Sequence, residues 1–193
     1  ERMPGQLVVK KGEWMLDLLA AWRLLRTVPC AAAMTARVAT DLAKCAGEVF
    51  RKDVSCTSLE AAMKLRHLNV RFIHAALETD WSADITPLSD LWQSEAHKVL
   101  DAKRSSPQHL TLLWEWLSDR ELWERSEALQ SVDAAYFDEA TYLHLQQALM
   151  HQVARRNVII ETLPSSNVRI SQYNNFSEHH SLRWMRVPGF VQE

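Results

Sequence analysis

Apolar residues that recur every three or four positions dominate this chain, and this spacing restricts its fold more than any other feature. One face of a helix buries such a stripe, whereas a half-buried strand needs an apolar residue at every second position. The first two stripes are Trp14, Leu18, Trp22 and Leu25, then Met34, Val38, Leu42 and Cys45. Pro29 separates them, so the sequence predicts a helical hairpin. Only four glycines occur in the chain, which disfavours folds built from many tight turns.

Two capping boxes predict further helix starts, Thr57 with Glu60 and Ser118 with Glu121. In this motif the hydroxyl accepts a hydrogen bond from a free backbone N–H, while the carboxylate three residues later reaches back to the cap. The segment after the first box, residues 69–77, fits two structures. A buried strand is one of them, but the apolar spacing also continues the helical pattern, and the helix is favoured.

Two further helix starts are predicted where a capping residue precedes proline, at Thr86-Pro87 and Ser106-Pro107. Proline suits the first helical position because the N–H that it lacks would have no partner there. The stripes expected to be buried in these two helices are Leu88, Leu91, Trp92 and Val99, then Leu110, Leu113, Trp114 and Leu117.

Residues 138–156 predict one long helix, after which the pattern changes. The stripe expected to be buried is Tyr142, Leu145, Leu149 and Val153. Acidic residues at the start and two arginines at the end suit the helix dipole. Asn157 can adopt the left-handed conformation that ends a helix, and the following run, VIIETL, is typical of a buried strand in a parallel sheet. The chain is therefore predicted to be predominantly α with a short α/β part.

Composition argues against several kinds of partner. The net charge is only −2, and no basic face indicates direct nucleic-acid binding. The three cysteines form no C-x-x-C motif and do not support a disulfide framework. No apolar run reaches the roughly 20 residues of a membrane helix. We expect a cytoplasmic protein without a membrane anchor and, because the first residue is glutamate rather than methionine, a fragment of a longer protein.

The stretch IIETLPSSNVRISQY, residues 159–173, is followed by EHHSLRWM, residues 178–185. Together they resemble the late-strand signature of the metal-dependent adenosine and AMP deaminases. In that family a strand ends in an acidic or polar residue, then come proline, a small residue and Ser-Asn, and further on a His or Asn opens a new segment. The resemblance covers residues 140–187.

This resemblance implies an incomplete (β/α)8 barrel of the TIM type. Residues 136–193 would supply a helix, a strand and an active-site loop, since barrel chemistry sits at the carboxyl ends of the strands. Residues 1–135 would be a helical insertion or accessory region that mediates a homo-oligomer. The antiphage adenosine deaminases of the RADAR type resemble this arrangement, a deaminase barrel enlarged by helical insertions.

The resemblance also implies roles for particular residues in binding substrate or orienting metal-bound groups. The corresponding residues are Glu161 at the strand end, Ser165, Ser166 and Asn167 in the loop, and His180 or its neighbour His179 downstream. The implied reaction is the hydrolytic deamination of a purine nucleoside or nucleotide by metal-activated water, giving an inosine product. None of the residues is assigned a catalytic role of its own.

The family's H-x-H pair and paired aspartates have no counterpart in this sequence. Two explanations are open: zinc, which the resemblance implies, is held by the rest of the barrel outside this chain, or the barrel has lost its metal site, and the first is favoured. A different class also remains open, a non-catalytic, all-helical protein-interaction module in which VIIETL is an edge strand. His144 and His151 lie seven residues apart on one predicted helix, which is too far for one metal ion, so a structural role is favoured for both.

Overall fold

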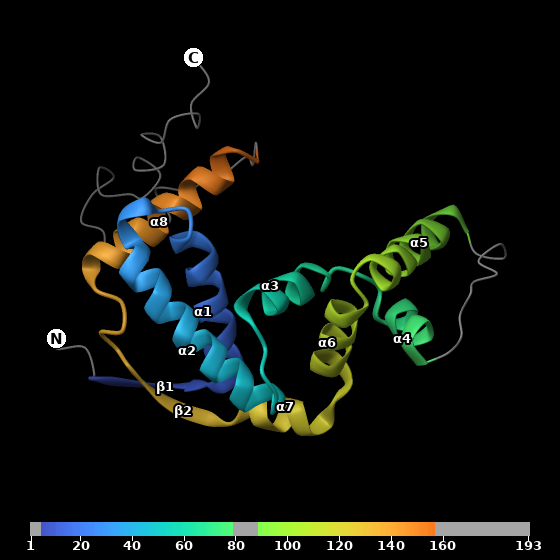
Figure 1. Ribbon diagram of the computed structural model, residues 1–193, viewed down its shortest axis with the longest axis horizontal. Coiled ribbons are helices and arrows are strands. Elements are labelled where there is room, and N and C mark those ends of the chain that lie inside the picture. Colours follow the sequence, from blue (N-terminus) through green and yellow to red (C-terminus); the bar gives the residue numbers. More distant parts are fainter. Residues whose placement is uncertain (1–4, 79–88, 157–193) are drawn as a thin grey trace, which may run out of the picture. The chain divides into compact units, whose positions relative to one another are not determined.

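The computed structural model describes residues 5–78 and 89–156. Within these ranges it contains eight α-helices, one short 3₁₀ helix and a two-stranded sheet (Figure 1). The predominantly helical class is therefore confirmed for this part of the chain. None of the described helices combines the length and apolar character that crossing a membrane requires. The described residues divide into two compact units: residues 5–22 with 36–78 and 89–136 form the larger, and residues 23–35 with 137–156 the smaller.

Helices α1 (Lys11–Leu25) and α2 (Ala32–Phe50) form the predicted hairpin (Figure 1). A 3₁₀ helix, Pro29–Ala31, lies between them. Lys11 Nζ at the start of α1 is 2.6 Å from Glu48 Oε2 near the end of α2, so the two helices run antiparallel. All the predicted stripe residues are buried except Trp14 and Met34, which are half-buried.

The sheet adds two strands to a region that was predicted to be helical. The strands are β1, Gln6–Lys10, and β2, Leu129–Asp133. They pair antiparallel, with Val9 opposite Gln130, and both of these side chains are half-buried on one face of the sheet. Val8 and Leu129 lie on the opposite face, where each is 68% exposed. Successive side chains of a strand alternate between faces, so the sheet buries only one side.

Five further helices complete the larger unit: α3 (Cys56–Lys64), α4 (Val70–Glu78), α5 (Asp90–Ser105), α6 (Pro107–Ser118) and α7 (Arg120–Glu127). The ambiguous segment 69–77 is thus mainly helical, as α4. Helix α6 begins at the predicted Pro107 and contacts α3, α4, α5 and α7. Its Leu110 and Leu113 are fully buried, as predicted, whereas Leu117 is 46% exposed. Helix α6 is therefore the central element of this group.

Two of the predicted caps are wrong by one or two residues. The N-cap of α3 is Ser55 rather than Thr57, and its Oγ accepts from the backbone N–H three residues on at 3.1 Å. The N-cap of α7 is Asp119 rather than Ser118, and its Oδ1 accepts in the same way at 3.0 Å. In both places several residues able to cap stand side by side, so the motif locates the helix start but not the cap itself.

The stripe predicted for α5 is confirmed at Val99 but wrong at Leu91 and Trp92. Leu91 is 70% exposed and Trp92 is 45% exposed, while Ala96, Val99 and Ala102 are buried. The core side of α5 is therefore lined mainly by small residues, which allow close helix packing. Thr86-Pro87 and Leu88 lie outside the described residues, and the first described residue before α5 is its N-cap, Ser89.

Helix α8 (Glu139–Ala154), in the smaller unit, also buries a face other than the predicted one. Tyr142 is 50% exposed and Leu149 is 46% exposed, whereas Thr141, Ala148 and Met150 are buried. Apolar residues surround most of this helix, so their spacing alone does not select the face that packs. Asn157 and the VIIETL run lie outside the described residues.

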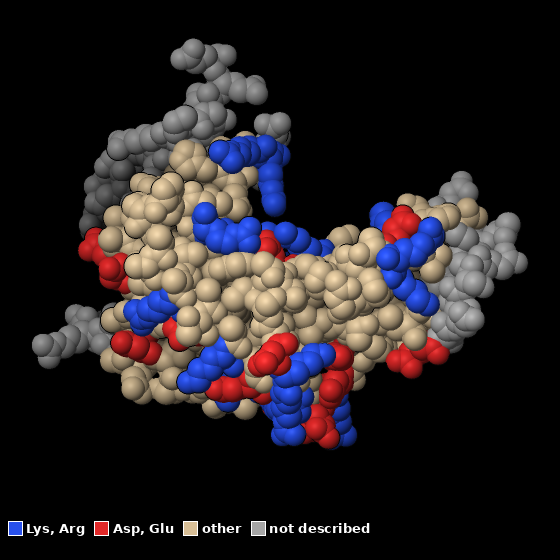
Figure 2. All heavy atoms as spheres, viewed as in Figure 1, with Lys and Arg blue, Asp and Glu red and all other residues tan. Residues whose placement is uncertain are grey.

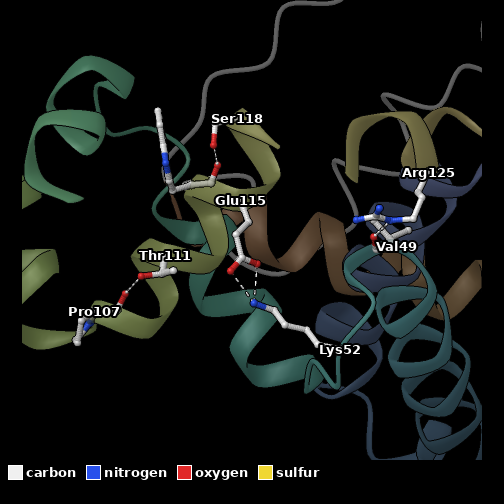
Figure 3. A network of polar contacts seen from close by, with 8 residues as sticks. Val49, Lys52, Pro107, Thr111, Glu115, Ser118 and Arg125 are labelled. Atoms are coloured by element: carbon white, nitrogen blue, oxygen red, sulfur yellow. Dashed lines mark hydrogen bonds and ion pairs between the residues drawn. The ribbon is translucent and has the colours of Figure 1, made fainter. Parts of the chain in front are cut away.

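The C-terminal end of α2 is held by two other helices (Figure 3). Arg125 Nε on α7 donates a hydrogen bond of 2.7 Å to Val49 O, one of the carbonyls that a helix end leaves without an internal partner. Lys52 Nζ, just beyond α2, lies 2.6 and 2.8 Å from the two carboxylate oxygens of Glu115 on α6. Arg51 has a φ of 55°, the left-handed conformation that commonly follows a helix end.

Acidic and basic side chains intermix over α7 in the space-filling view (Figure 2). Arg120 Nε lies 3.0 Å from Glu124 Oε1, and an Arg125 nitrogen lies 3.5 Å from Glu121 Oε2. Both pairs are four residues apart, the first fully on the exposed side of the helix and the second reaching it only through Glu121, since the Arg125 side chain is 18% exposed. Such surface pairs each contribute little to stability, typically about 0.3–0.5 kcal/mol, so the bond from Arg125 to the buried Val49 is the stronger contact.

Gly12 in α1 has no room for a side chain. A Cβ atom there would lie 2.8 Å from Ser126 Cβ and 3.1 Å from Trp116 Cη2. We expect Gly12→Ala to lower the free energy of unfolding by about 1–3 kcal/mol, because overpacking outweighs the gain in helix propensity. The control is Gly47→Ala in α2, where the atom nearest to the added Cβ would be Lys52 O at 3.8 Å. There we expect the free energy of unfolding to rise by about 0.5–1 kcal/mol. Urea unfolding followed by tryptophan fluorescence checks both, and effects of the same sign would contradict the packing argument.

Removal of the Arg125 guanidinium leaves the Val49 carbonyl at the end of α2 without its partner. We expect Arg125→Ala to lower the free energy of unfolding by about 1–3 kcal/mol, the usual cost of an unpaired buried polar group. Arg120→Ala on the same helix removes an arginine whose side chain is 88% exposed, and it should change stability by less than about 0.5 kcal/mol. Thermal unfolding of the two variants makes the comparison. Similar losses would mean that the bond to Val49 has no special weight.

Candidate functional site

A cavity of about 220 Å³ lies in the larger unit, bordered by α1, one face of α2, and β2 with the turn that follows it. We call it the tyrosine pocket. Its lining consists of Trp14, Asp41, Lys44, Cys45, Glu48, Gln130, residues 131–133 and Tyr136. All of these residues belong to one compact unit, so the geometry of the pocket is internal to that unit.

Local structure explains how these side chains meet. The four residues from α2 follow the spacing i, i+3, i+4 and i+7, which places them on one helix face. Gln130 points to the half-buried face of β2, and pairing with β1 holds that strand in register. The Tyr136 N–H donates to Asp133 O at 3.0 Å and closes the turn after β2. Trp14 comes from the first turns of α1.

Tyr136 makes more contacts than any other aromatic residue of the pocket. Its hydroxyl donates to Asp41 Oδ2 at 2.6 Å. The Trp14 ring packs edge-on, with 5.1 Å between ring centroids, and the guanidinium carbon of Arg37 lies 4.3 Å from the tyrosine centroid. That distance is within the range of a cation–π interaction. Side chains from α1 and α2 therefore contact both the hydroxyl and the ring of Tyr136.

The pKa of the Tyr136 phenol is raised above its ordinary value. Burial is the main cause, because it disfavours the charged phenolate. The hydrogen bond to Asp41 and the negative charge of Asp41 raise the pKa further, while Arg37 acts in the opposite direction. The phenol therefore keeps its proton at neutral pH and serves as a hydrogen-bond donor rather than as a base.

The floor of the pocket contains a thiol and an amide. Burial raises the pKa of Cys45, Glu48 adds to the rise, and the thiol donates to Lys11 O at 3.6 Å. Gln130 Nε2 is buried and forms no hydrogen bond with any residue that the structure describes. The Cys45 sulfur, which Gln130 contacts, compensates little for the missing hydrogen bond, because sulfur is a weak acceptor. A buried amide without a full hydrogen-bond partner costs about 1–3 kcal/mol, so Gln130 is destabilising where it lies.

Charges of both signs surround the pocket. Lys11 lies 2.6 Å from Glu48 and lowers the pKa of that carboxyl, which is therefore ionised at neutral pH. Asp41 adds a carboxylate and Lys44 an exposed ammonium group, whereas the Asp133 side chain lies on the exposed face of β2. Among residues 5–78 and 89–156, no three His, Cys, Asp or Glu side chains converge as metal ligands would. The pocket is suited to binding a small polar molecule and contains no activated nucleophile.

The residues that the family resemblance singles out lie outside the described part of the chain. They are Glu161, Ser165, Ser166, Asn167 and His180, together with His179. Their roles stay predictions. No known protein-family profile matches the sequence, and a search of curated proteins found no significant match. The deaminase resemblance therefore rests on residues 159–173 and 178–185.

His144 and His151 lie in the smaller unit, where both line a second cavity of about 340 Å³. His144 Nε2 is 3.7 Å from Cys30 Sγ, and Thr27, Val28 and Pro29 also line this cavity. The two histidines are separated by two helical turns, or about 10 Å along the axis. Neither the spacing nor the described neighbours bring a third metal ligand to them.

The amino-acid pattern alone did not identify the tyrosine pocket. One available signal was the polar face of α2, because Asp41, Lys44 and Glu48 recur at helical spacing beside the buried Cys45. Gln130 and Tyr136 gave no signal, since their place in the pocket depends on the pairing of β2 with a strand near the start of the chain.

The raised pKa of Tyr136 makes folding stability depend on pH. The folded state keeps the phenolic proton to a higher pH than the unfolded chain does, so this stabilisation is complete below the ordinary tyrosine pKa of about 10 and is lost as the pH rises above it. We expect Tyr136→Phe to lose less stability than the wild type between about pH 9 and 11. Urea unfolding at several pH values measures this slope. Tyr142→Phe, at a ring that is 50% exposed, is the control and should keep the wild-type slope.

Proposed function

We propose that this chain is part of a purine deaminase that converts adenosine or an adenine nucleotide to the corresponding inosine product. The observation that carries the proposal is the order of features in residues 140–187: a long helix, an asparagine, an apolar run, the P-S-S-N loop and a later histidine pair. Helix α8, Glu139–Ala154, supports the first part of this order. In this proposal the chain contributes one segment of an incomplete (β/α)8 barrel.

Polar residues of the P-S-S-N loop would contact the purine. Both the Asn167 amide and the Ser166 hydroxyl can donate and accept hydrogen bonds, which suits the mixed donor and acceptor edge of a purine base. Glu161 would lie at the carboxyl end of the strand, where barrel enzymes place their active sites. Ser165 and His180 would complete the lining and orient groups bound to the metal, as residues around a metal site do.

Zinc, in this proposal, would supply an activated water for attack on the purine carbon that carries the amino group. The described residues do not fit a zinc site, because no three ligating side chains converge among them. The ligands and the proton shuttle would therefore come from the rest of the barrel. The share of this chain would be to bind the purine and fix its orientation.

Helices of the larger unit would form an insertion beside the barrel and provide contacts for a homo-oligomer. Large apolar side chains on their surface support this role: Leu91 is 70% exposed, Trp92 45% and Trp123 58%. Burying such side chains against another subunit is favourable in proportion to the apolar area removed from water. The same observation favours a second candidate function, a non-catalytic helical interaction module that binds another protein through these residues.

Substitution in the P-S-S-N loop separates the two candidates. In the full-length protein, we expect the double variant Ser166→Ala, Asn167→Ala to lower kcat/KM for adenosine deamination by about 10–100-fold or more, with Tm unchanged. Release of ammonia and formation of inosine measure turnover. Ser171→Ala, a serine outside the tetrapeptide, is the control and should keep wild-type activity. A stable double variant with unchanged turnover would contradict the site assignment, and a wild-type protein without turnover would favour the interaction module.

A further inference from the structure

We propose that Cys30 is a site of reversible thiol–disulfide exchange with small acidic disulfides of the glutathione class. Three observations support this role together: the exposure of the thiol, its contact with His144, and a cavity with a basic lining beside both residues. All of these residues belong to the smaller unit. None of them lies in residues 158–187, so the inference does not rest on the deaminase proposal.

The three cysteines of the chain differ in how easily a reagent reaches them. Cys30, in the 3₁₀ helix between α1 and α2, is exposed. Cys45 is buried and Cys56 is half-buried, burial raises the pKa of both thiols, and each donates to a backbone carbonyl. Because the thiolate is the form that attacks a disulfide, Cys45 and Cys56 are poor nucleophiles at neutral pH. A disulfide should therefore react at Cys30 first.

His144 on α8 is positioned to take the proton of the Cys30 thiol. Its Nε2 lies 3.7 Å from Cys30 Sγ, close enough for a hydrogen bond that involves sulfur. When the ring proton is on Nδ1, Nε2 is the nitrogen that accepts the S–H. An adjacent base of this kind is what converts a cysteine into a nucleophile.

The second cavity, of about 340 Å³, lies beside this pair, and we call it the histidine cavity. Cys30 adjoins it, because its contact His144 and its chain neighbour Pro29 both belong to the lining. No aspartate or glutamate is among the described residues of the lining, and the polar residues that α8 contributes are His144, Gln147, His151, Gln152 and Arg155. An anion in this cavity would therefore meet donors and positive charge without a carboxylate that repels it.

A glutathionyl group attached to Cys30 would fit the histidine cavity in length and charge. An extended tripeptide spans about 10 Å. His144 and His151 are separated by about the same distance along the axis of α8. The carboxylates at the far end of the tripeptide would therefore lie near His151 and Arg155, and a guanidinium can bind a carboxylate through two parallel N–H bonds.

The exchange is balanced without a further reagent. Cys30 gives its proton to His144, and the thiolate attacks one sulfur of oxidised glutathione. A new S–S bond forms to Cys30 while the old S–S bond breaks, and the leaving glutathione thiolate takes the proton from His144. The Cys30 sulfur is oxidised and the leaving sulfur is reduced. Reduced glutathione runs the same steps backwards, so the modification is reversible.

Mass spectrometry of the intact, folded chain after incubation with oxidised glutathione tests the proposal. We expect one glutathionyl group per chain, located on Cys30 by peptide mapping and removed by reduced glutathione. Cystamine, a cationic disulfide, is the comparison reagent, and each rate is divided by the rate of the same disulfide with free N-acetylcysteine. The corrected rate for cystamine should be lower by about tenfold or more, because the basic lining repels it. No modification, modification first at Cys45 or Cys56, or equal corrected rates would overturn the proposal.

Two substitutions separate the base from the carboxylate contact. His144→Gln cannot take a proton and should slow the exchange with both disulfides by about tenfold or more. Arg155→Gln should slow the reaction of oxidised glutathione alone and bring its corrected rate towards that of cystamine. Arg156→Gln, at the next and equally exposed arginine, which is not part of the lining, is the matched control and should keep the wild-type rates.

Equal wild-type rates in the His144 variant would overturn the role of the base. An Arg155 variant that slows both disulfides equally, or that matches the Arg156 variant, would overturn the carboxylate contact. The Tm of each variant shows whether it is folded, and the comparison of the two arginine variants does not depend on the stability of His144→Gln.

Discussion

Carbonyl groups at the C-terminal end of a helix have no partner within the helix, and in α2 the Arg125 guanidinium supplies one for Val49. Much of the larger unit depends on this contact, because α2 carries one face of the tyrosine pocket. Two ion pairs flank it, Lys52 with Glu115 and Lys11 with Glu48, and they connect the same end of α2 to α6 and to α1. Exposed pairs of this kind are individually weak. Together with the hydrogen bond from Arg125 to Val49, the two ion pairs hold the C-terminal end of α2 against α1, α6 and α7.

Helices were the part of the fold that sequence spacing could predict. Helix α2 is apolar mainly on one side, so its period identifies both the helix and the buried face. Helix α1 carries further apolar residues outside its stripe, yet three of the four residues of that stripe are buried. Helix α8 is apolar on several sides, and there the period identifies a helix but not its orientation. In α5 the buried positions are Val99, which the spacing identified, and two alanines, which a search for large apolar residues overlooks. The strands could not be predicted in this way, because β1 and β2 are five residues each and acquire their structure from one another.

The candidate sites differ in how far the sequence can predict them. The deaminase signature consists of neighbouring residues, so a short stretch such as P-S-S-N suggests a role through its amino-acid order alone. The tyrosine pocket combines residues of α1, α2 and β2 that are distant in the sequence, and each of them is unremarkable alone. The sequence does not single out Gln130, because a glutamine in a strand is common. The fold does, because a buried amide nitrogen without a hydrogen-bond partner is rare. A site of this kind is visible only in the folded chain.

Strands β1 and β2 are far apart in the sequence, and this separation slows the formation of the sheet. The side-chain hydrogen bond between Ser131 and Gln6 joins residues 125 positions apart, and the whole sheet closes a loop of similar length. Contacts this distant in sequence form slowly, because the entropy of closing the loop is lost before the contact stabilises anything. During synthesis the residues of β1 leave the ribosome long before those of β2 are made, so the backbone groups of β1 have no strand to pair with during that time. The tyrosine pocket, which needs β2 in place, should therefore be among the last parts of the larger unit to form.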